Sequence, residues 1–388
     1  MPSRRRFLAA TGATVTTLAG CLGSDDLPDY TMPDRHGPPP DPGKHVFGSD
    51  GRWSSRGFDA ANTRWDYAGT GPVDDAAVRW RHPIAQVGRR APTVSDDRLF
   101  LPDGDRLVAL DAGDADELWT ASGTAPPLGK PLVREGVVYA ALGDDLRALD
   151  AGTGEVRWSR SFDGPLTAPA TVAGRDLVVG DGERVRVLDA ETGEERWSRR
   201  LFGAVNYPAL AVADYPVVST EAGEVCALGH DGRGGWRRSL RTTTTAPVTM
   251  GRDHVYVAGD DGTVRALSFG GKTEWVARGV EAGRFGVAYT DSYVYAIDGD
   301  TLHALGSESG DRHWTFDLGA TTGAPTVVGH SVYAGGDRLY GHHPEGDGPR
   351  FSLDLGGTVG PDVTFGDGIV YAPVSTGDGA ELVAVEPR

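Results

Sequence analysis

The chain has 388 residues, of which 39% are hydrophobic, 56 are glycine and 25 are proline, and its formal net charge is −17. This composition fits one large all-β domain or two small ones, with turn residues throughout. The excess of acidic side chains excludes a general affinity for nucleic acid, whose phosphates require a basic protein face.

The N-terminus predicts an exported lipoprotein. The motif SRRRFL at residues 3–8 resembles the twin-arginine signal, an address that is read by the export receptor for folded proteins. The apolar run at residues 7–20 is too short to span a bilayer as a mature helix, and it ends in LAGC at residues 18–21, which resembles a lipobox. We therefore expect residues 1–20 to be a signal peptide and Cys21 to carry lipid. The alternative is a cytoplasmic protein that begins with basic residues by chance.

Residues 21–45 are predicted to form a flexible tether. They include the run PPPDP at residues 38–42, and their composition is that of an extended, uncharged to acidic segment. Lipid on Cys21 would hold the protein at the outer face of the cytoplasmic membrane by an anchor rather than by a spanning helix. The remaining cysteine is Cys226, so we expect no internal disulfide once Cys21 is lipidated.

A 39-residue period runs through the rest of the chain. Seven tryptophans are each 39 residues apart, and Phe351 continues the series 37 residues after the last of them: Trp80, Trp119, Trp158, Trp197, Trp236, Trp275 and Trp314. A fixed period of this size indicates a repeat fold, and the blades of a propeller when each unit consists of strands. Within each period, glycine-rich turns separate four short runs that are β-branched or alternate in polarity.

The third run of the repeat occurs eight times, from LVAL at residues 107–110 to LVAV at residues 382–385. Residues 46–388 are therefore predicted to form an all-β, eight-bladed β-propeller of four-stranded blades, with seven blades as the alternative. The last blade lacks a fourth strand of its own, whereas AVRW at residues 77–80 precedes the first blade. We expect this N-terminal strand to complete the last blade and close the ring, which removes long sheet edges.

The repeat carries a turn motif, seen in ALDAGTGEVRW at residues 148–158 and in two similar copies at residues 109–119 and 187–197. The aspartate can accept hydrogen bonds from amides of the turn, and the glycine supplies a positive φ. The tryptophan can wedge between neighbouring blades with its indole N–H on a carbonyl. We assign a structural role in blade docking to Asp111, Trp119, Asp150, Gly154, Trp158, Asp189, Gly193, Trp197, Trp236, Trp275 and Trp314.

This motif resembles the repeat of pyrroloquinoline quinone (PQQ) propellers, eight-bladed proteins in which the tryptophan docks one blade on the next. The stretches FGSDG at residues 47–51 and DAANTR at residues 59–64 are also similar to the beginning of such proteins. The resemblance implies the fold of residues 46–388 and leaves the function open. Quinoprotein dehydrogenases of this family bind PQQ and Ca²⁺ on the ring axis and oxidise alcohols or sugars, whereas BamB-type lipoproteins have no cofactor and act as scaffolds.

Two departures from the family pattern weigh against an enzyme. The chain lacks the adjacent cysteine pair that the alcohol dehydrogenases of the family place over the cofactor, since Cys226 is its only cysteine besides Cys21. A chain of 388 residues also has no room for the long inserted loops that cover PQQ and hold Ca²⁺ in those enzymes. No inward carboxylate stands out at the axis to act as a base.

A ligand of a propeller usually meets the first residues of the innermost strands, which line the axis. Most of these positions are small here, and the exceptions are cations, an amide and aromatic rings: Arg90, Lys130, Asn206, Tyr207, Arg284 and Phe285. Three cations in an acidic chain would attract an anion, and two aromatic rings could stack on a planar ligand. PQQ, which is a tricarboxylate, and an acidic peptide both suit such a site. The alternative is that these side chains only fill the mouth or point to solvent.

The positive charges are almost all arginine, because only Lys44, Lys130 and Lys272 are lysine, which leaves 35 arginines among 38 cations (38 − 3). An acidic chain with so little lysine is typical of proteins that work in molar salt, where screening makes a high density of like charge tolerable. The alternative is an arginine-rich sequence from a GC-biased genome. We favour the halophilic interpretation.

The sequence thus predicts a monomeric, membrane-anchored propeller that acts as a non-catalytic binding or scaffold lipoprotein. Its partner would be an unidentified protein or a small anionic ligand, and we expect no resident metal or cofactor. The alternative function is that of a PQQ- and Ca²⁺-dependent alcohol or sugar dehydrogenase.

Overall fold

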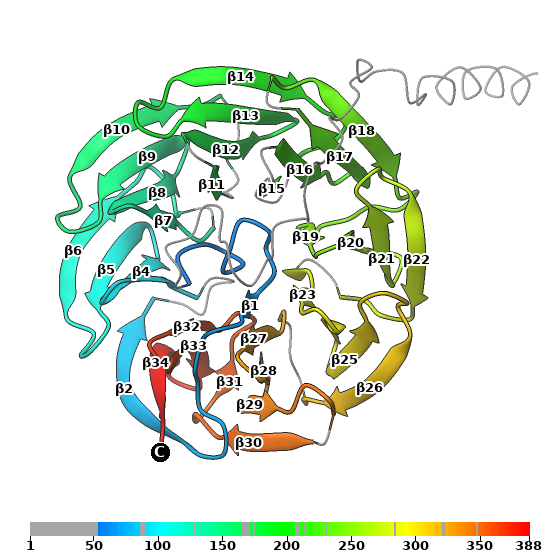
Figure 1. Cartoon of the computed structure of the whole chain (residues 1–388). Coiled ribbons are helices and arrows are strands. Elements are labelled where there is room, and N and C mark those ends of the chain that lie inside the picture. The colour runs from blue at the N-terminus through cyan, green and yellow to red at the C-terminus, as the bar shows by residue number, and fades with distance from the viewer. Residues whose placement is uncertain are drawn as a thin grey trace, which may run out of the picture.

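The structure is a computed structural model. It describes residues 53–85, 91–127, 129–163, 166, 171–173, 175–205, 210–212, 215–229, 231–282, 285–319, 323–346 and 348–388. These residues form 34 β-strands in eight sheets, which are arranged as blades around a central axis (Figure 1). The predicted all-β propeller with eight blades is therefore confirmed. The described part of the chain contains no helix of the length and hydrophobicity needed to cross a membrane.

The strands of each blade follow one another along the chain from the axis outward. Blade one consists of β3 (Thr93–Ser95), β4 (Arg98–Asp103), β5 (Arg106–Asp111) and β6 (Glu117–Ser122); blade two of β7 (Leu132–Arg134), β8 (Val137–Leu142), β9 (Asp145–Asp150) and β10 (Val156–Ser161); blade three of β11 (Thr171–Ala173), β12 (Asp176–Asp181), β13 (Arg184–Asp189) and β14 (Glu195–Arg200); and blade four of β15 (Leu210–Val212), β16 (Tyr215–Ser219), β17 (Glu224–Leu228) and β18 (Gly234–Ser239). Blade five consists of β19 (Thr249–Met250), β20 (His254–Gly259), β21 (Thr263–Ser268) and β22 (Thr273–Arg278); blade six of β23 (Ala288–Tyr289), β24 (Tyr293–Asp298), β25 (Thr301–Gly306) and β26 (Arg312–Asp317); and blade seven of β27 (Thr326–Val328), β28 (Ser331–Gly335), β29 (Leu339–His342) and β30 (Pro349–Leu353).

Blade eight contains strands from both ends of the described chain. It consists of β31 (Thr358–Val359), β32 (Thr364–Gly366), β33 (Ile369–Thr376) and β34 (Gly379–Pro387), and β2 (Ala76–Ile84) adds the outer strand. β2 pairs antiparallel with β34, and Trp80 lies opposite Ala384 after a bulge, just as Trp119 lies opposite Ala109 in blade one. Figure 1 shows the two strands side by side, β2 in light blue and β34 in red. The predicted closure of the ring by an N-terminal strand is confirmed.

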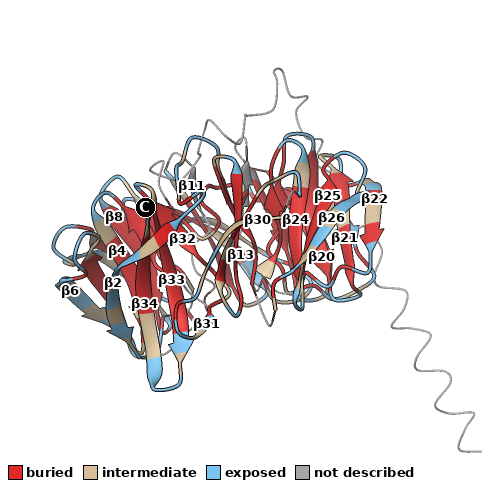
Figure 2. Cartoon of the chain, turned by 90° about the horizontal axis from the view of Figure 1, so that it is seen from below, coloured by how far each residue is buried: buried red, intermediate tan, exposed pale blue. Residues whose placement is uncertain are grey.

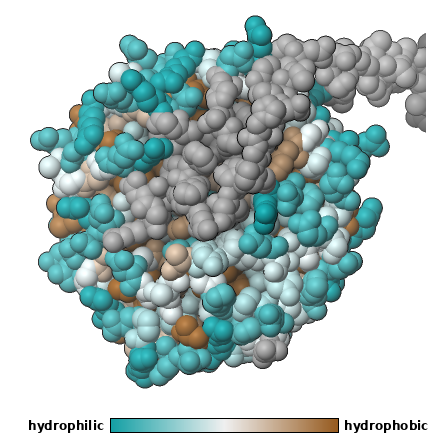
Figure 3. All heavy atoms as spheres, in the orientation of Figure 1, coloured by the Kyte–Doolittle hydropathy of each residue, from teal (hydrophilic) through white to brown (hydrophobic). Residues whose placement is uncertain are grey.

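The burial of each strand depends on its position in the blade. Middle strands such as β8 and β20 are buried along their whole length, because a neighbouring blade covers each face of the sheet. The outer strands β6 and β10 alternate between exposed and partly buried residues, since solvent reaches them. Figure 2 shows the buried strands as a red layer inside an exposed rim, and Figure 3 shows that hydrophilic side chains dominate the rim of one face.

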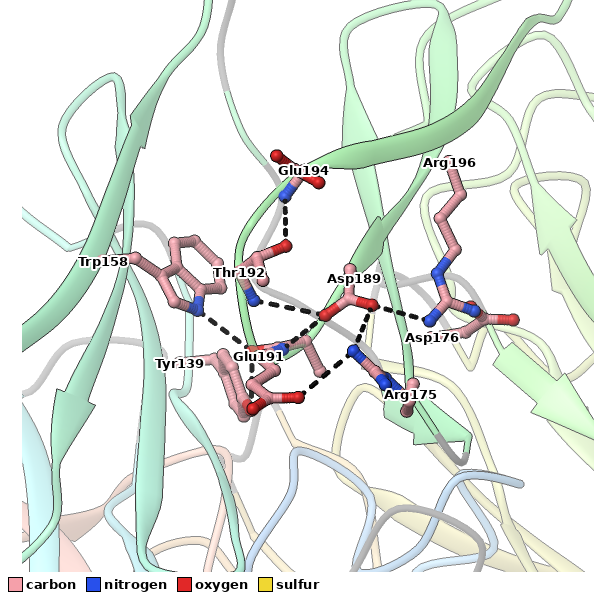
Figure 4. A network of polar contacts seen from close by, with 10 residues as sticks. Tyr139, Trp158, Arg175, Asp176, Asp189, Glu191, Thr192, Glu194 and Arg196 are labelled. Carbon is pink, nitrogen blue, oxygen red and sulfur yellow. Dashed lines mark hydrogen bonds and ion pairs between the residues drawn. The ribbon is translucent and has the colours of Figure 1, made fainter.

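The turn motif docks neighbouring blades on one another, and the contact between blades two and three illustrates the geometry (Figure 4). The Trp158 indole N–H donates a hydrogen bond to the carbonyl of Ala190 over 3.0 Å, and its ring lies against Gly193 of the same turn. A Cβ at Gly193, which has a φ of 74°, would lie only 2.7 Å from the Trp158 ring. Glycine is therefore required here both for the left-handed backbone and for the close approach of the ring.

The aspartate of the motif organises the turn that receives the ring. One carboxylate oxygen of Asp189 accepts hydrogen bonds from the amides of Glu191 and Thr192, and the other pairs with Arg175 and Arg196 (Figure 4). The hydrogen bond from Arg196 is the main reason that the pKa of Asp189 is lowered to about 2. The turn is thus held by an ionised carboxylate on an Asx-type loop.

The same docking contact recurs around the ring. In six of the contacts the indole N–H donates to a carbonyl of the next blade: Trp80 to Ala112, Trp119 to Ala151, Trp158 to Ala190, Trp236 to Phe269, Trp275 to Ser307 and Trp314 to Pro344. The Trp197 ring lies against Gly232, in the position that Gly154 holds against Trp119. Asp111 and Asp150 accept turn amides from Gly113 and Gly152 as Asp189 does from Glu191. These contacts join neighbouring blades.

Candidate functional site: the filled axis of the propeller

The axis of the propeller is occupied by a segment of the chain itself, Trp53–Asp66, which we call the axial segment. In Figure 1 it is the blue trace that crosses the centre of the ring before the chain runs out to β2. Its carbonyls accept main-chain hydrogen bonds from the innermost strands of five blades. The pairs are Val94 with Trp53, Val133 with Ser54, Met250 with Ala61, Tyr289 with Thr63 and Val327 with Arg64, each over 2.8 or 2.9 Å.

The axial segment ends as a strand, because β1 (Trp65–Asp66) pairs parallel with β27 of blade seven. At its other end the Trp53 ring is fully buried and packs against Phe58 and Phe365. The segment therefore supplies hydrogen-bond acceptors for main-chain amides of the inner strands, and it also contributes to the hydrophobic core.

The backbone of the axial segment is strained. Phe58, Asn62 and Arg64 have φ values of 77°, 54° and 54°, a left-handed conformation that side chains with a Cβ rarely adopt. Asp59 stabilises the turn between them, since its carboxylate accepts hydrogen bonds from the amide and the hydroxyl of Thr63 over 2.9 and 2.7 Å. Such strain persists only where the surrounding structure imposes it, and here the inner strands on several sides do so.

Three charged side chains meet beside the axial segment: Arg64, Lys130 and Asp362, which we call the axial triad. The Asp362 carboxylate bonds Arg64 through one oxygen and the Lys130 ammonium through the other, the latter over 2.9 Å, and all three side chains are nearly inaccessible to solvent. Lys130 also donates to the hydroxyl of Thr364 over 3.1 Å. The triad thus joins the axial segment to blades two and eight.

Burial and mutual attraction set the protonation of the triad. Burial opposes the charge of Asp362, but the neighbouring Lys130 and Arg64 outweigh it and lower the pKa of the carboxyl. Burial also lowers the pKa of Lys130 to about 8, although the charge of Asp362 opposes this shift. The ammonium and the carboxylate therefore stabilise each other in their charged forms at neutral pH.

Asp59 differs from the triad because no cation is paired with it among the described residues. Burial raises the pKa of its carboxyl to about 7, against the hydrogen bonds from Thr63 that favour the ionised form. The axial segment thus contains a carboxyl group that loses its proton near neutral pH.

The structure places the residues predicted to bind a ligand as follows. Lys130 lies in the axial triad, and Phe285 is half-buried at the start of blade six. Arg90, Asn206, Tyr207 and Arg284 lie outside the described residues, as does the lipidation residue Cys21. The structure thus describes two of the six side chains, and the role of the six as a ligand site stays a prediction.

Asp59 and Asp362, the carboxylates of the axis, were not among the predicted site residues. Asp362 directly follows Pro361 at the start of blade eight, and Asp59 and Arg64 lie in the DAANTR stretch at residues 59–64. The sequence around both carboxylates was thus noticeable, but it could not show that an N-terminal stretch and a C-terminal blade meet at the axis.

The described residues of the axis do not fit PQQ with Ca²⁺. The axial segment takes up the space between the inner strands, and Arg64 and Lys130 share Asp362 instead of presenting free charge to a tricarboxylate. Within the described ranges, no group of three or more His, Cys, Asp or Glu side chains is placed to hold a metal ion. We therefore derive no chemical step through this cofactor.

The sequence matches the family described as outer membrane protein assembly factor BamB over residues 72–201, 182–283 and 261–348. Among solved structures, the chain is similar to BamB from Moraxella catarrhalis, with a TM-score of 0.66, 18% identity and coverage of 80% of this chain and 99% of that chain. It is also similar to the quinohemoprotein alcohol dehydrogenase from Comamonas testosteroni, with a TM-score of 0.70, 16% identity and coverage of 86% and 80%. A quinohemoprotein alcohol dehydrogenase from Pseudomonas putida HK5 has a TM-score of 0.73, 14% identity and coverage of 87% and 80%. Comparison with curated proteins found no match.

The similar structures include both a BamB and dehydrogenases, and at such low identity they show the fold alone. The family match is stronger evidence, because it extends from residue 72 to residue 348 of the 388. The chain therefore belongs to the PQQ-like propeller family described as outer membrane protein assembly factor BamB.

Proposed function

We propose that this chain is a non-catalytic binding or scaffold protein, exported and held at the outer face of the cytoplasmic membrane by lipid on Cys21. The occupied axis is the observation that carries this proposal. Main-chain hydrogen bonds from five blades and the buried axial triad fix the axial segment in place. A propeller built in this way is a rigid body whose outer surfaces and loops remain available to a partner.

The family description supports a role in binding other proteins outside the cytoplasm, although a partner cannot be transferred from it. The twin-arginine motif at residues 3–8 and the lipobox at residues 18–21 support export and anchoring. The tether at residues 21–45 would give the propeller reach from the membrane, and the acidic composition with three lysines supports work in molar salt.

Calorimetric titration of the mature protein with PQQ, with and without Ca²⁺, in multimolar KCl tests the non-catalytic role. We expect no binding heat from folded protein. Tight, Ca²⁺-dependent binding would contradict the proposal, above all if Lys130→Met or Arg284→Ala removed it while the control Lys272→Met did not. Lys272 is a suitable control because its exposed side chain pairs only with Glu274 among the described residues.

Fractionation of cells that express the full chain tests the anchor. We expect the wild type in the membrane fraction and accessible to protease added outside the cell. Cys21→Ser should be exported but released into the medium, and replacing Arg5 and Arg6 by lysine should leave the protein inside the cell. Membrane association of Cys21→Ser equal to that of the wild type would contradict lipid anchoring, without affecting the proposed scaffold role.

A further inference from the structure

A chain of tyrosine and tryptophan rings connects the surface to the buried axis between blades five and six. Its ring centroids are 5.7 Å apart from Tyr67 to Trp65, 6.4 Å from Trp65 to Tyr289, 5.4 Å from Tyr289 to Tyr256 and 5.8 Å from Tyr256 to Trp275. Tyr67 is 56% exposed, whereas the other four side chains are at most 8% exposed. We call these five residues the aromatic chain.

The propeller repeat accounts for only the outer part of the aromatic chain, the pair Tyr256 and Trp275. A tyrosine of the second strand packs on the docking tryptophan in several blades, as Tyr139 does on Trp158 and Tyr295 on Trp314. Tyr256 and Trp275 are the blade-five example. Tyr289 stacks on Tyr256 at 26° and extends this pair toward the axis. From there, Trp65 and Tyr67 of the N-terminal segment continue the aromatic chain to solvent.

The hydrogen-bond partners along the chain differ in their ability to take a proton. No described residue accepts a hydrogen bond from the buried Trp65 indole N–H, and the Tyr256 hydroxyl donates to the main-chain carbonyl of Ser307. The Tyr289 hydroxyl donates to the carboxylate of Asp291 over 3.4 Å. Loss of an electron makes an aromatic side chain strongly acidic, so a tyrosyl radical is stabilised where a carboxylate can accept the phenol proton. In the aromatic chain this position is Tyr289.

From this geometry we propose that the aromatic chain relays one-electron oxidation from the surface at Tyr67 to the buried Tyr289. A peroxyl radical at the surface takes an electron from Tyr67 and a proton from solvent and becomes a hydroperoxide. The electron that Tyr67 has lost is replaced from Tyr289 through Trp65. The Tyr289 hydroxyl transfers its proton to the Asp291 carboxylate, so that one electron leaves the protein and a neutral tyrosyl radical and a protonated Asp291 remain. A surface thiol or ascorbate-type reductant that supplies one electron by the same route restores Tyr289 when Asp291 returns the proton.

Laser flash-quench oxidation tests the relay on the whole protein. Photoexcited tris(bipyridine)ruthenium(II), quenched by chloropentaamminecobalt(III), serves as the surface oxidant, and freeze-quench electron paramagnetic resonance detects the radical. We expect a long-lived tyrosyl spectrum in the wild type. Tyr289→Phe should leave only the short-lived radical of the exposed Tyr67, because phenylalanine keeps the ring but cannot be oxidised at this potential. Tyr67→Phe and Trp65→Phe should lower the yield of the same radical, since each interrupts the path.

Tyr340→Phe is the matched control. The Tyr340 hydroxyl also donates to a carboxylate, that of Asp337 over 2.7 Å, but its ring contacts are with Phe316 and His342 rather than with another tyrosine or tryptophan. We expect this variant to keep the wild-type spectrum. A long-lived radical that survives in Tyr289→Phe, or that disappears in Tyr340→Phe, would overturn the proposal.

Two measurements separate the relay from a purely structural role of these rings. Asp291→Asn should slow the formation of the radical and change its deuterium isotope effect, because the amide cannot accept the phenol proton, while the thermal stability changes little at this exposed side chain. Tyr67→Phe alters only an exposed side chain, so its effect does not depend on a buried substitution being tolerated. An Asp291→Asn variant with wild-type kinetics and isotope effect would show that Tyr289 is not the site of the radical.

Discussion

His342 shows what a single residue does when it departs from the repeat. It occupies the position that holds Leu110, Leu149 and Leu188 in blades one to three, and it is buried beside the Phe316 ring. No described residue bonds its Nε2 atom. Burial lowers its pKa to about 4, so the side chain is neutral in the folded protein at ordinary pH.

We expect His342→Leu to stabilise the protein by about 1 kcal/mol at neutral pH, because it replaces a buried, unpaired polar atom by the side chain that the other blades use. The gain should grow as the pH falls from 6.5 toward 4, the interval in which the unfolded chain takes up a proton that the folded state excludes. Urea unfolding at pH 7 and pH 5 in fixed salt measures both effects. His330→Leu, at an exposed site, is the control, and an equal gain in both variants would contradict this explanation.

Asp59 should have the opposite dependence on pH. Its pKa is raised to about 7 in the folded protein from 3.8, so its contribution to stability is complete below pH 3.8 and is lost as the pH rises to about 7. Asp59→Asn, which stays neutral, should therefore gain stability relative to the wild type over this interval. Asp189→Asn is a control of opposite sign, because a pKa near 2 makes the native carboxylate stabilising above pH 3.8. A constant difference between Asp59→Asn and the wild type across the interval would refute a raised pKa at Asp59.

At the scale of the element, the docking turn combines backbone conformation with packing against a ring. Gly193 and Gly182 both have a positive φ, of 74° and 54°, but only Gly193 lies against a tryptophan. No described atom lies within 4 Å of a Cβ built at Gly182. Comparing Gly193 with Gly182 therefore separates the requirement for a left-handed backbone from the requirement for space beside the tryptophan ring.

Gly193→Ala should destabilise the protein by about 1–2 kcal/mol from the left-handed backbone and by a further 1–3 kcal/mol from the displaced Trp158 ring. Gly182→Ala should show only the first effect. Thermal unfolding of both variants, followed by tryptophan fluorescence, measures the difference. Equal losses in the two variants would mean that the ring is not confined by the turn.

The elements were predictable to different degrees. The repeat predicted the blades, their strand number and the closing strand β2, because each copy of the motif carries the same turn residues and the same hydrophobic alternation. Blade seven departs from the repeat, since Gly341 and Phe351 stand where other blades have alanine and tryptophan. The Phe351 ring lies where a Cβ at Gly341 would be, so the two changes compensate each other in space.

The axial segment could not be predicted, because it has no repeat and its contacts are dispersed over the whole chain. Arg64 meets Asp362 across 298 residues, and Lys130 reaches Thr364 across 234. A sequence shows which residues can form ion pairs, but a buried pair of this kind depends on the closed ring that brings its members together. The same reason explains why Lys130 was expected at the mouth of a ligand site and instead lies buried in the triad.

At the scale of the whole molecule, the net charge of −17 should make stability depend on salt. We expect the unfolding temperature to rise steadily as KCl is raised from low to multimolar concentration, because screening weakens repulsion among the excess acidic groups. The same titration with NaCl distinguishes screening from binding of a particular cation. An unfolding temperature that is constant or falls over this range would favour the alternative that the arginine content only reflects genome composition.

The closure of the ring also has a consequence for synthesis. β2 pairs with β34 through residues such as Trp80 and Ala384, which are 304 positions apart (384 − 80), so β2 leaves the ribosome long before its partner exists. During that time one edge strand of nine residues stays open to other nascent chains. Arg79, Arg81 and Pro83 interrupt this strand with charges and a missing N–H, as gatekeeper residues do in aggregation-prone segments. We therefore expect the sequence of β2 to limit aggregation of the incomplete chain during translation as well as to complete the last blade.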